Sequence, residues 1–254
     1  MARKASVKAA SCSTLVPLGD YRLIQTDLPS VPEKETREAL RWQLRDQVDV
    51  PIEDAVIDFL PLPQVASGRP PQVLAAVAPA EVVAPIVQAF QAAKLKLTVI
   101  DLPEMAQRNI AALFETENRG LAFLAFGETS ALLTFTYQGE LFALRRIEIG
   151  AQQFAGATPE RREQLAERVV LEMQRSMDTV DRQFSSISLS RLVVALPPDS
   201  GLEASFANAF YLPCEAMDLT TVLDLSAYPA LQDPEAQRRA LLTLGAALRV
   251  EEAH

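Results

Sequence analysis

The residue types that most often carry out catalysis are scarce in this chain and poorly spaced for it. The only histidine is His254, the last residue, so a histidine-based triad or proton shuttle is excluded in practice. The two cysteines, Cys12 and Cys214, lie far apart and outside any C-x-x-C spacing. They are too few for a disulfide framework or a zinc site, and they fit a reducing compartment.

Carboxylates and glycines do not supply the missing chemistry. The pairs Glu53-Asp54 and Glu251-Glu252 are sequence neighbours that nothing positions around a pocket, so we interpret them as solvated surface. The phosphate-binding pattern G-x-x-x-x-G-K-[ST] does not occur. The sequence predicts no catalytic residue, no metal ligand and no bound cofactor.

Three residues on a predicted helix over 33–49 are candidates for contact with a partner protein. Arg41 and Arg45 share one face at i, i+4 spacing, and Trp42 lies off the apolar stripe of this helix. Tryptophan and arginine are enriched in binding hot spots. The alternative, which we favour for Trp42, is that it packs against the second subdomain.

A second group of candidates is basic. Arg168, Arg175 and Arg182 recur every seven residues on a long predicted helix, where they could receive an acidic tail or form a solvated face. We favour the solvated face. Arg145-Arg146 could clamp an anion, although a structural ion pair with Glu148 or Glu140 is the favoured interpretation.

Composition narrows the function classes. The chain has 254 residues, 49% of them hydrophobic, and a net charge of −9. An acidic surface repels phosphate backbones, so we expect no nucleic-acid binding. No stretch approaches the roughly 20 apolar residues of a membrane span, and no apolar signal-peptide core is found. We expect a soluble cytoplasmic protein that reaches the inner membrane only through a partner, with a homo-oligomer left open.

The first half alternates short strands and helices. A hairpin is predicted between Leu15 and Leu28, turning at Gly19-Asp20. Ser30 and Glu33 have capping-box spacing and open a helix that Pro51 stops. The remaining predicted elements are strands over 55–62 and 72–78, joined by a loop with Ser67-Gly68 at its tip, a helix over 81–94, a strand over 95–101 and a helix from Pro103 to about Glu115.

In the second half, the residue pattern predicts a meander of three strands followed by alternating helices and strands. The strands cover 121–127, 131–138 and 141–149, and they are followed by a helix over 159–184, a strand over 191–196, a helix over 202–210, a strand near 214–217 and a helix over 234–248. This is the order of a ribonuclease-H-like unit, and the first half is a shortened, decorated version of it. We therefore predict an α/β fold of two actin-like subdomains with mixed sheets, divided into residues 1–118 and 119–254.

Three separated segments resemble type IV pilus biogenesis proteins of the MshI and PilM kind. They are ALRWQLRDQVDVPIEDAVIDFLPLP (39–63), LEMQRSMDTVDRQF (171–184) and ALLTLGAALR (240–249). The resemblance implies a cytoplasmic actin-like protein beneath a type IV pilus machine. It also implies a partner, which in that family is a single-pass inner-membrane protein whose short cytoplasmic tail docks on the soluble one.

Three segments that bind the nucleotide in an actin-like ATPase lack the expected residue types in this sequence. In the second phosphate loop, Gly127, Glu128, Thr129 and Ser130 keep turn chemistry, but the position of the metal-binding Asp holds Ala125 or Phe126. The first loop needs Asp-x-Gly, whereas residues 1–14 hold no Asp or Gly, so the chain is expected to begin late relative to the family. The strand over 191–196 ends in Pro197-Pro198-Asp199-Ser200-Gly201 instead of a glycine-rich nucleoside loop.

The expected function is a non-catalytic cytoplasmic scaffold in assembly of a pilus of the mannose-sensitive haemagglutinin type. It would bind the cytoplasmic tail of an inner-membrane pilus protein. Two alternatives stay open. One is an active ATPase of the same machinery, with the missing loop supplied by residues absent here or by another subunit. The other is the cytoplasmic domain of a type II secretion platform protein.

Overall fold

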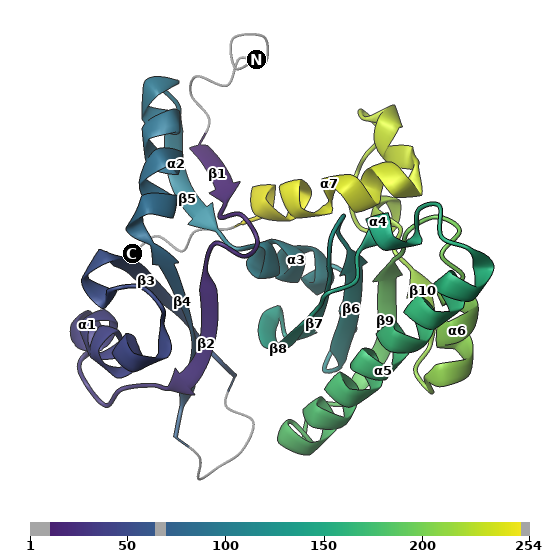
Figure 1. The fold of residues 1–254 in the computed structure, drawn as a ribbon, viewed down its shortest axis with the longest axis horizontal. Coiled ribbons are helices and arrows are strands. Elements are labelled where there is room, and N and C mark those ends of the chain that lie inside the picture. Colours follow the sequence, from purple (N-terminus) through teal and green to yellow (C-terminus); the bar gives the residue numbers. More distant parts are fainter. Residues whose placement is uncertain (1–10, 64–69, 250–254) are drawn as a thin grey trace. The chain divides into compact units, whose positions relative to one another are not determined.

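The computed structural model describes residues 11–63 and 70–249, which form two compact units divided between Pro103 and Glu104 (Figure 1). Within these ranges, no helix has the length and the apolar composition that a bilayer span requires. Each unit has its own sheets and core, and each is described separately below.

The first unit holds two small sheets. A parallel pair joins β1 (Ser11–Leu15) to β5 (Lys96–Asp101), and an antiparallel sheet has the order β2-β4-β3. The remaining elements are β2 (Arg22–Asp27), α1 (Glu33–Leu44), short 3-10 turns at Arg45–Gln47 and Ile52–Asp54, β3 (Ala55–Pro61), β4 (Gln72–Pro79) and α2 (Ala80–Ala92). The predicted strands over 55–62 and 72–78 are confirmed and pair antiparallel, and the tip Ser67-Gly68 lies outside the described residues.

The predicted apolar stripe of α1 forms the core of the antiparallel sheet. Leu40 and Leu44 are fully buried against Ile57, Val73 and Val77. Their i, i+4 spacing places both side chains on the face that meets the sheet, while most other residues of α1 are polar. Burial of two leucines by one short helix supplies a few kcal/mol, at about 1.5–3 kcal/mol each.

The predicted hairpin between Leu15 and Leu28 is wrong. The turn itself forms, because the Asp20 amide donates to the Pro17 carbonyl over 3.1 Å and Gly19 takes φ +101°. However, β1 pairs in parallel with β5, and β2 pairs with β4 in the other sheet. Turn residues report only local geometry, whereas the partner of a strand is decided by tertiary packing.

The predicted capping box at Ser30 and Glu33 is also wrong. Pro32 occupies the N-cap position of α1, and no side chain caps the helix. The Val31 amide donates to the Pro29 carbonyl over 2.9 Å, so the chain makes a tight turn just before the helix. The helix ends at Leu44, short of Pro51, because residues 45–47 tighten into a 3-10 turn.

The second unit has the predicted ribonuclease-H-like topology. Its five strands follow the order β10-β9-β6-β7-β8, with β6, β9 and β10 parallel and β7 and β8 added as an antiparallel meander. The bounds are α3 (Pro103–Ala112), β6 (Gly120–Phe126), β7 (Ala131–Tyr137), β8 (Glu140–Ile147), α4 (Ala151–Phe154), α5 (Pro159–Gln183), β9 (Leu189–Ala195), α6 (Leu202–Ala209), β10 (Cys214–Ala216), 3-10 turns at Leu219–Thr221 and Pro229–Gln232, and α7 (Pro234–Ala247). The short helix α4 was not predicted.

Helices cover both faces of this sheet. Residues of α3 and α7, including Ile110 and Leu241, pack with Phe123 of β6 on one face. Figure 1 shows α5 and α6 on the other face. The predicted buried side of α5 is confirmed by the low exposure of Leu165, Val169, Met173 and Val180. Phe184 packs edge-on against Phe142 with ring centroids 5.0 Å apart.

The division between the units falls at the first residue of α3, between Pro103 and Glu104, whereas the sequence placed it at 118/119. The difference is explained by polar side chains of α3 that bond within the second unit. The buried Gln107 amide donates to the Phe123 and Leu132 carbonyls over 3.2 and 2.9 Å, and Asn109 donates to the Gly245 carbonyl over 2.9 Å. The sequence does not indicate which groups a glutamine and an asparagine on a predicted helix will bond.

Gly245 marks the closest approach of α7 to α3. A Cβ added there would lie 2.0 Å from the Ala106 carbonyl oxygen, so the two helix backbones nearly touch. We predict that Gly245→Ala destabilises the protein by about 1–3 kcal/mol in urea unfolding. The matched control is Thr243→Ala on the exposed face of α7, where higher helix propensity should stabilise slightly. Stabilisation by Gly245→Ala would contradict the close packing.

Candidate functional site

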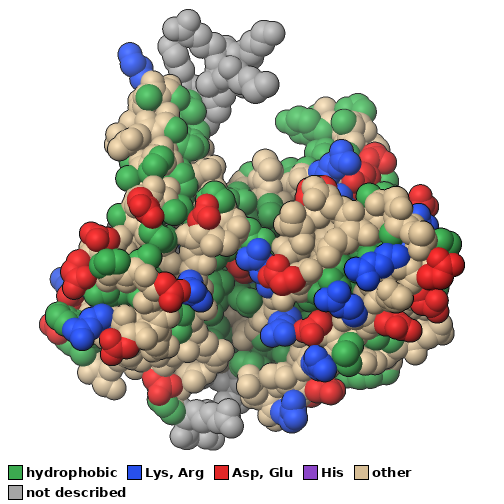
Figure 2. All heavy atoms as spheres, viewed as in Figure 1, with side chains coloured by type: hydrophobic (Ala, Val, Ile, Leu, Met, Phe, Trp, Pro, Cys, Tyr) green, Lys and Arg blue, Asp and Glu red, His purple; other side chains and the backbone are tan. Residues whose placement is uncertain are grey.

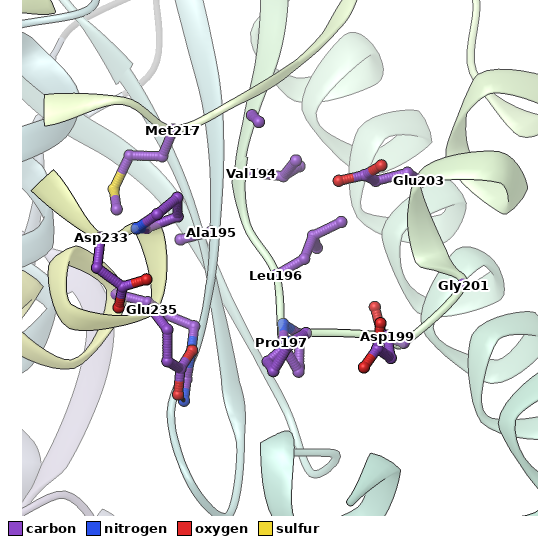
Figure 3. Close-up of a pocket in the computed structure, with 15 residues that line it drawn as sticks. Val194, Ala195, Leu196, Pro197, Asp199, Gly201, Glu203, Met217, Asp233 and Glu235 are labelled. Carbon is purple, nitrogen blue, oxygen red and sulfur yellow. Dashed lines mark hydrogen bonds and ion pairs between the residues drawn. The ribbon is translucent and has the colours of Figure 1, made fainter.

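The parallel strands β6, β9 and β10 end at one edge of the second unit's sheet, which is where ligands bind in open α/β sheets. A pocket of about 500 Å³ lies at this edge (Figure 3). Its walls are the end of β9 with the loop that follows, the start of α6, the end of β10 and the first turn of α7. Asp199 and Gly201 in the loop take positive φ values of 52° and 74°.

The pocket is acidic. Figure 3 shows Asp199 and Glu203 beside the loop after β9, with Asp233 and Glu235 across from them on α7. Arg238 is the one basic side chain among the lining residues. Four carboxylates against one guanidinium leave a formal charge of about −3, which opposes a triphosphate at short range.

The helix ends at the pocket already hold the protein's own carboxylates. Asp233 caps α7, where its Oδ2 accepts from the Ala236 amide over 2.8 Å, and Glu235 lies in the first turn. Glu203 lies in the first turn of α6. Helix N-termini favour anions, and here that preference is met by side chains of the chain itself.

Arg238 links α7 to the turn that follows β6. Its side chain is 4% exposed, and its Nε and Nη2 donate to both Glu235 oxygens over 2.7 and 2.8 Å. Nη2 also lies 3.4 Å from Glu128 Oε1, and Nη1 donates to the Phe126 carbonyl. A buried guanidinium is tolerable only when its donors are used in this way. We call Arg238, Glu235, Glu128 and the Phe126 carbonyl the Arg238 cluster.

Arg238 and Glu235 hold each other ionised. The pKa of Glu235 is lowered mainly by the hydrogen bond from Arg238, although partial burial opposes the shift. The pKa of Arg238 is raised by the same bond, with Glu128 adding to it. Proton transfer at neutral pH is therefore disfavoured for both groups, which makes them structural partners and poor acid-base catalysts.

The turn with the predicted degenerate phosphate loop is held by neighbouring backbone. The Gly127 amide donates to the Ser130 carbonyl over 2.9 Å, and the Gly127 and Glu128 carbonyls accept from the first amides of α4 over 2.9 and 3.0 Å. Gly150 packs so closely that an added Cβ would lie 2.4 Å from the Glu128 carbonyl oxygen. Of the four loop candidates, Ser130 is buried, and Gly127, Glu128 and Thr129 are exposed.

The sequence missed Arg238 and Glu235. The only local signal was an Asp-Pro-Glu-x-x-Arg start to the last helix, which predicts a cap and an i, i+3 ion pair. Nothing in that pattern indicates that Arg238 also reaches Phe126 and Glu128, which lie 112 and 110 residues earlier in the sequence.

The candidates on α1 separate into structural and exposed residues. The Arg41 guanidinium donates to the Ile52 carbonyl and, over 3.1 Å, to the Ala55 carbonyl, so it holds the 3-10 turn before β3. Trp42 is 62% exposed, and Arg45 makes only a loose ion pair with its neighbour Asp46 at 3.6 Å. The packing of Trp42 on the second subdomain stays a prediction.

The basic candidates also fall into two groups. Arg168 and Arg175 of α5 line a second pocket together with Arg145 and Arg146 of β8, whereas Arg182 is not among its lining residues. The predicted pair between Arg146 and Glu148 forms at 3.1 Å. Arg145 instead pairs with Glu172 of α5 at 2.7 Å, a contact that strand alternation could not reveal.

The remaining groups to consider are metal-ligating side chains and the thiol of Cys214. In the part of the chain that the structure describes, no group of three or more His, Cys, Asp or Glu side chains is arranged to hold a metal ion, and His254 lies outside that part. Burial raises the pKa of the Cys214 thiol, with Glu203 and Glu215 adding to the shift. A raised pKa lowers the thiolate fraction and hence nucleophilicity.

The ribonuclease-H-like second unit, together with an α/β first unit that has two smaller sheets, places the chain in the actin-like fold class. Among solved structures, it is similar to the PilM-PilN type IV pilus biogenesis complex, with a TM-score of 0.77 and 22% identity over 98% of this chain and 82% of that one. It is also similar to the cytoplasmic domain of EpsL, an inner-membrane component of the type II secretion system of Vibrio cholerae, with a TM-score of 0.52 and 14% identity over 98% of this chain and 79% of that one. No protein-family model and no curated relative matches the sequence.

The Arg238 cluster predicts a pH-dependent stability. A lowered carboxyl pKa in the folded state stabilises it above the ordinary value of 4.5, and this contribution is lost as the pH falls through the lowered pKa. We expect Glu235→Gln to cost about 3 kcal/mol at pH 7, because it leaves a buried guanidinium short of its partner. The cost should shrink in urea unfolding below pH 4.5.

The control variant is Arg239→Gln, which removes the other arginine paired with Glu235. Arg239 is 68% exposed, so its loss should cost under about 1 kcal/mol at either pH. Equal effects of the two substitutions at pH 7 would show that burial of Arg238 does not set the strength of the cluster.

Proposed function

We propose that the chain is a non-catalytic cytoplasmic scaffold of a type IV pilus assembly machine of the mannose-sensitive haemagglutinin type. It binds the cytoplasmic tail of an inner-membrane pilus protein. The proposal is supported by the three segments that resemble MshI- and PilM-type proteins and by the fold shared with PilM over 98% of the chain. In that solved structure PilM is in complex with PilN.

The Arg238 cluster is the observation that carries the non-catalytic part of the proposal. In an active relative, the turn after the first meander strand holds a phosphate and a metal-binding Asp. Here Arg238 donates to Phe126 and contacts Glu128 at that turn, and α4 binds the turn carbonyls. A nucleotide would have to break these contacts and enter a pocket lined by four carboxylates.

Two other functions have some support. An active ATPase of the same machinery is favoured only by the fold, since members of this class include ATPases. A type II secretion platform role is favoured by the likeness to the EpsL domain, although its TM-score of 0.52 is below the 0.77 for PilM. The pilus scaffold therefore stays the leading proposal.

Nucleotide binding is tested by thermal unfolding with Mg-ATP. A ligand at one hundred times its Kd stabilises a protein by about 2.7 kcal/mol, which shifts the Tm by several degrees. We expect no shift at millimolar Mg-ATP beyond that of magnesium chloride alone. A magnesium-dependent shift with ATP that is absent with AMP would replace the scaffold with an ATPase.

Tail binding is tested with a synthetic peptide of the cytoplasmic tail of a PilN-type protein. Trp42 is the only tryptophan and is 62% exposed, so its fluorescence can report a tail that docks on α1. We expect Trp42→Ala to weaken binding tenfold or more in calorimetry, as is usual for a hot-spot tryptophan. The control is Tyr228→Ala, an equally exposed aromatic residue of the second unit.

The two substitutions separate the docking face from the function. Loss of affinity in Tyr228→Ala but not in Trp42→Ala would move the docking face away from α1. Absence of any binding by the wild-type chain would contradict the adaptor role itself.

A further inference from the structure

A second concave surface lies between the edge strand β8 and the helix α5. Its volume is about 380 Å³, and we call it the arginine groove. Figure 2 shows the Lys and Arg side chains of this face, interspersed with Asp and Glu. The groove is lined by four arginines, two glutamates and three apolar residues, namely Arg145, Arg146, Arg168, Arg175, Glu148, Glu172, Ile147, Ile149 and Leu171.

The two glutamates do not neutralise the four arginines. Glu172 is shared by Arg145 at 2.7 Å and Arg175 at 3.3 Å, and this sharing lowers its pKa. Among the described residues, Arg168 has no ion-pair partner. Each guanidinium has five N–H donors, so most donors in the groove are unused by side chains of the protein.

The net charge of the arginine groove is opposite in sign to that of the whole chain. Four arginines and two glutamates give the groove a formal charge of about +2, whereas the chain carries −9. A negatively charged ligand is repelled by the molecule at long range and attracted only at the groove. This pattern selects for a ligand that fits the groove, where short-range contacts outweigh the screened repulsion.

The strand beside the groove favours an extended ligand. β8 is the outermost strand of its sheet and pairs only with β7 among the described residues. An edge strand offers unpaired backbone groups to a peptide that adds as a further strand. Leu171, 46% exposed at the groove, adds a place for one apolar side chain.

We propose that the arginine groove binds an extended acidic segment of a partner protein, with acidic side chains at alternate positions and one apolar residue against Leu171. A lipid surface is the weaker candidate, because a bilayer cannot enter a concave groove and anionic lipids would face the −9 charge of the rest of the chain. The site does not depend on tail docking at α1 or on the pilus role.

The test uses a fluorescent ten-residue peptide in which Glu alternates with Ser and one central Glu is replaced by Leu. In a strand, alternate side chains share one face, so the glutamates can all point to the arginines. We expect the wild-type chain to bind this peptide in fluorescence anisotropy and to bind a version with Lys for Glu at least tenfold more weakly. Affinity should fall steeply as salt increases.

Substitutions test whether the peptide binds in the arginine groove. Arg168→Glu/Arg175→Glu should lower peptide affinity at least thirtyfold, since two charge-assisted contacts become repulsive. Arg182→Glu makes the same kind of substitution once, on α5 but outside the lining residues, so it should lower affinity less than threefold. Trp42→Ala should leave peptide affinity unchanged, which keeps this site separate from the proposed tail site. Unchanged Tm values would show that the variants fold.

Three outcomes would overturn the proposal. The first is absence of selective binding of the acidic peptide by the wild-type chain. The second is a loss of binding free energy in Arg182→Glu that reaches half the loss in the double variant, because net charge alone would give that ratio. The third is arginine-dependent binding to vesicles containing phosphatidylserine, or competition by millimolar inorganic phosphate with no peptide preference, which would assign the groove to a lipid headgroup or a free anion.

Discussion

The arrangement of side chains at the edge where β6, β9 and β10 end depends on one buried guanidinium. Arg238 must keep its donors satisfied because removing an arginine from water costs several kcal/mol. Its partners come from its own helix and from the turn after β6, so α7 and that turn are held together by the same charge. The sequence predicts that the metal-binding Asp of an actin-like ATPase is replaced here by Ala125 or Phe126. The carboxylates of Glu128 and Glu235 already accept from Arg238.

Elements with strong periodicity could be predicted from the sequence, and their partners could not. The buried face of α5 and the meander β6-β7-β8 follow from apolar spacing and turn residues, because these patterns act over a few neighbouring positions. By contrast, β1 pairs with β5 across some 85 residues, and nothing near Gly19 indicates it. The absent capping box at Ser30 has a similar cause, since Pro29 and Pro32 set a backbone path that spacing alone does not reveal.

The contacts of the candidate site were also hard to predict from the sequence, because they join residues that lie far apart in it. The expected absence of a metal-binding Asp in the turn after β6 comes from the residue types at 125–130, because a metal ligand must be a particular kind of residue, and it stays a prediction. The contact of Arg238 with Glu128 could not be inferred, since the two residues lie 110 positions apart and Arg238 already has a local ion pair with Glu235. Likewise, the basic stripe predicted on one helix becomes a groove only because β8 adds Arg145 and Arg146.

The second unit thus presents two concave surfaces of opposite charge. At the edge where β6, β9 and β10 end, four carboxylates and one guanidinium line the pocket, and all three nitrogens of that guanidinium already donate within the protein, so an added anion would meet repulsion and find few donors. In the arginine groove, two carboxylates serve four arginines, so an added carboxylate would find donors without displacing a partner. The difference lies in donor satisfaction more than in net charge. This difference in open guanidinium donors supports the proposal that the second unit recognises acidic groups of a partner protein at the arginine groove.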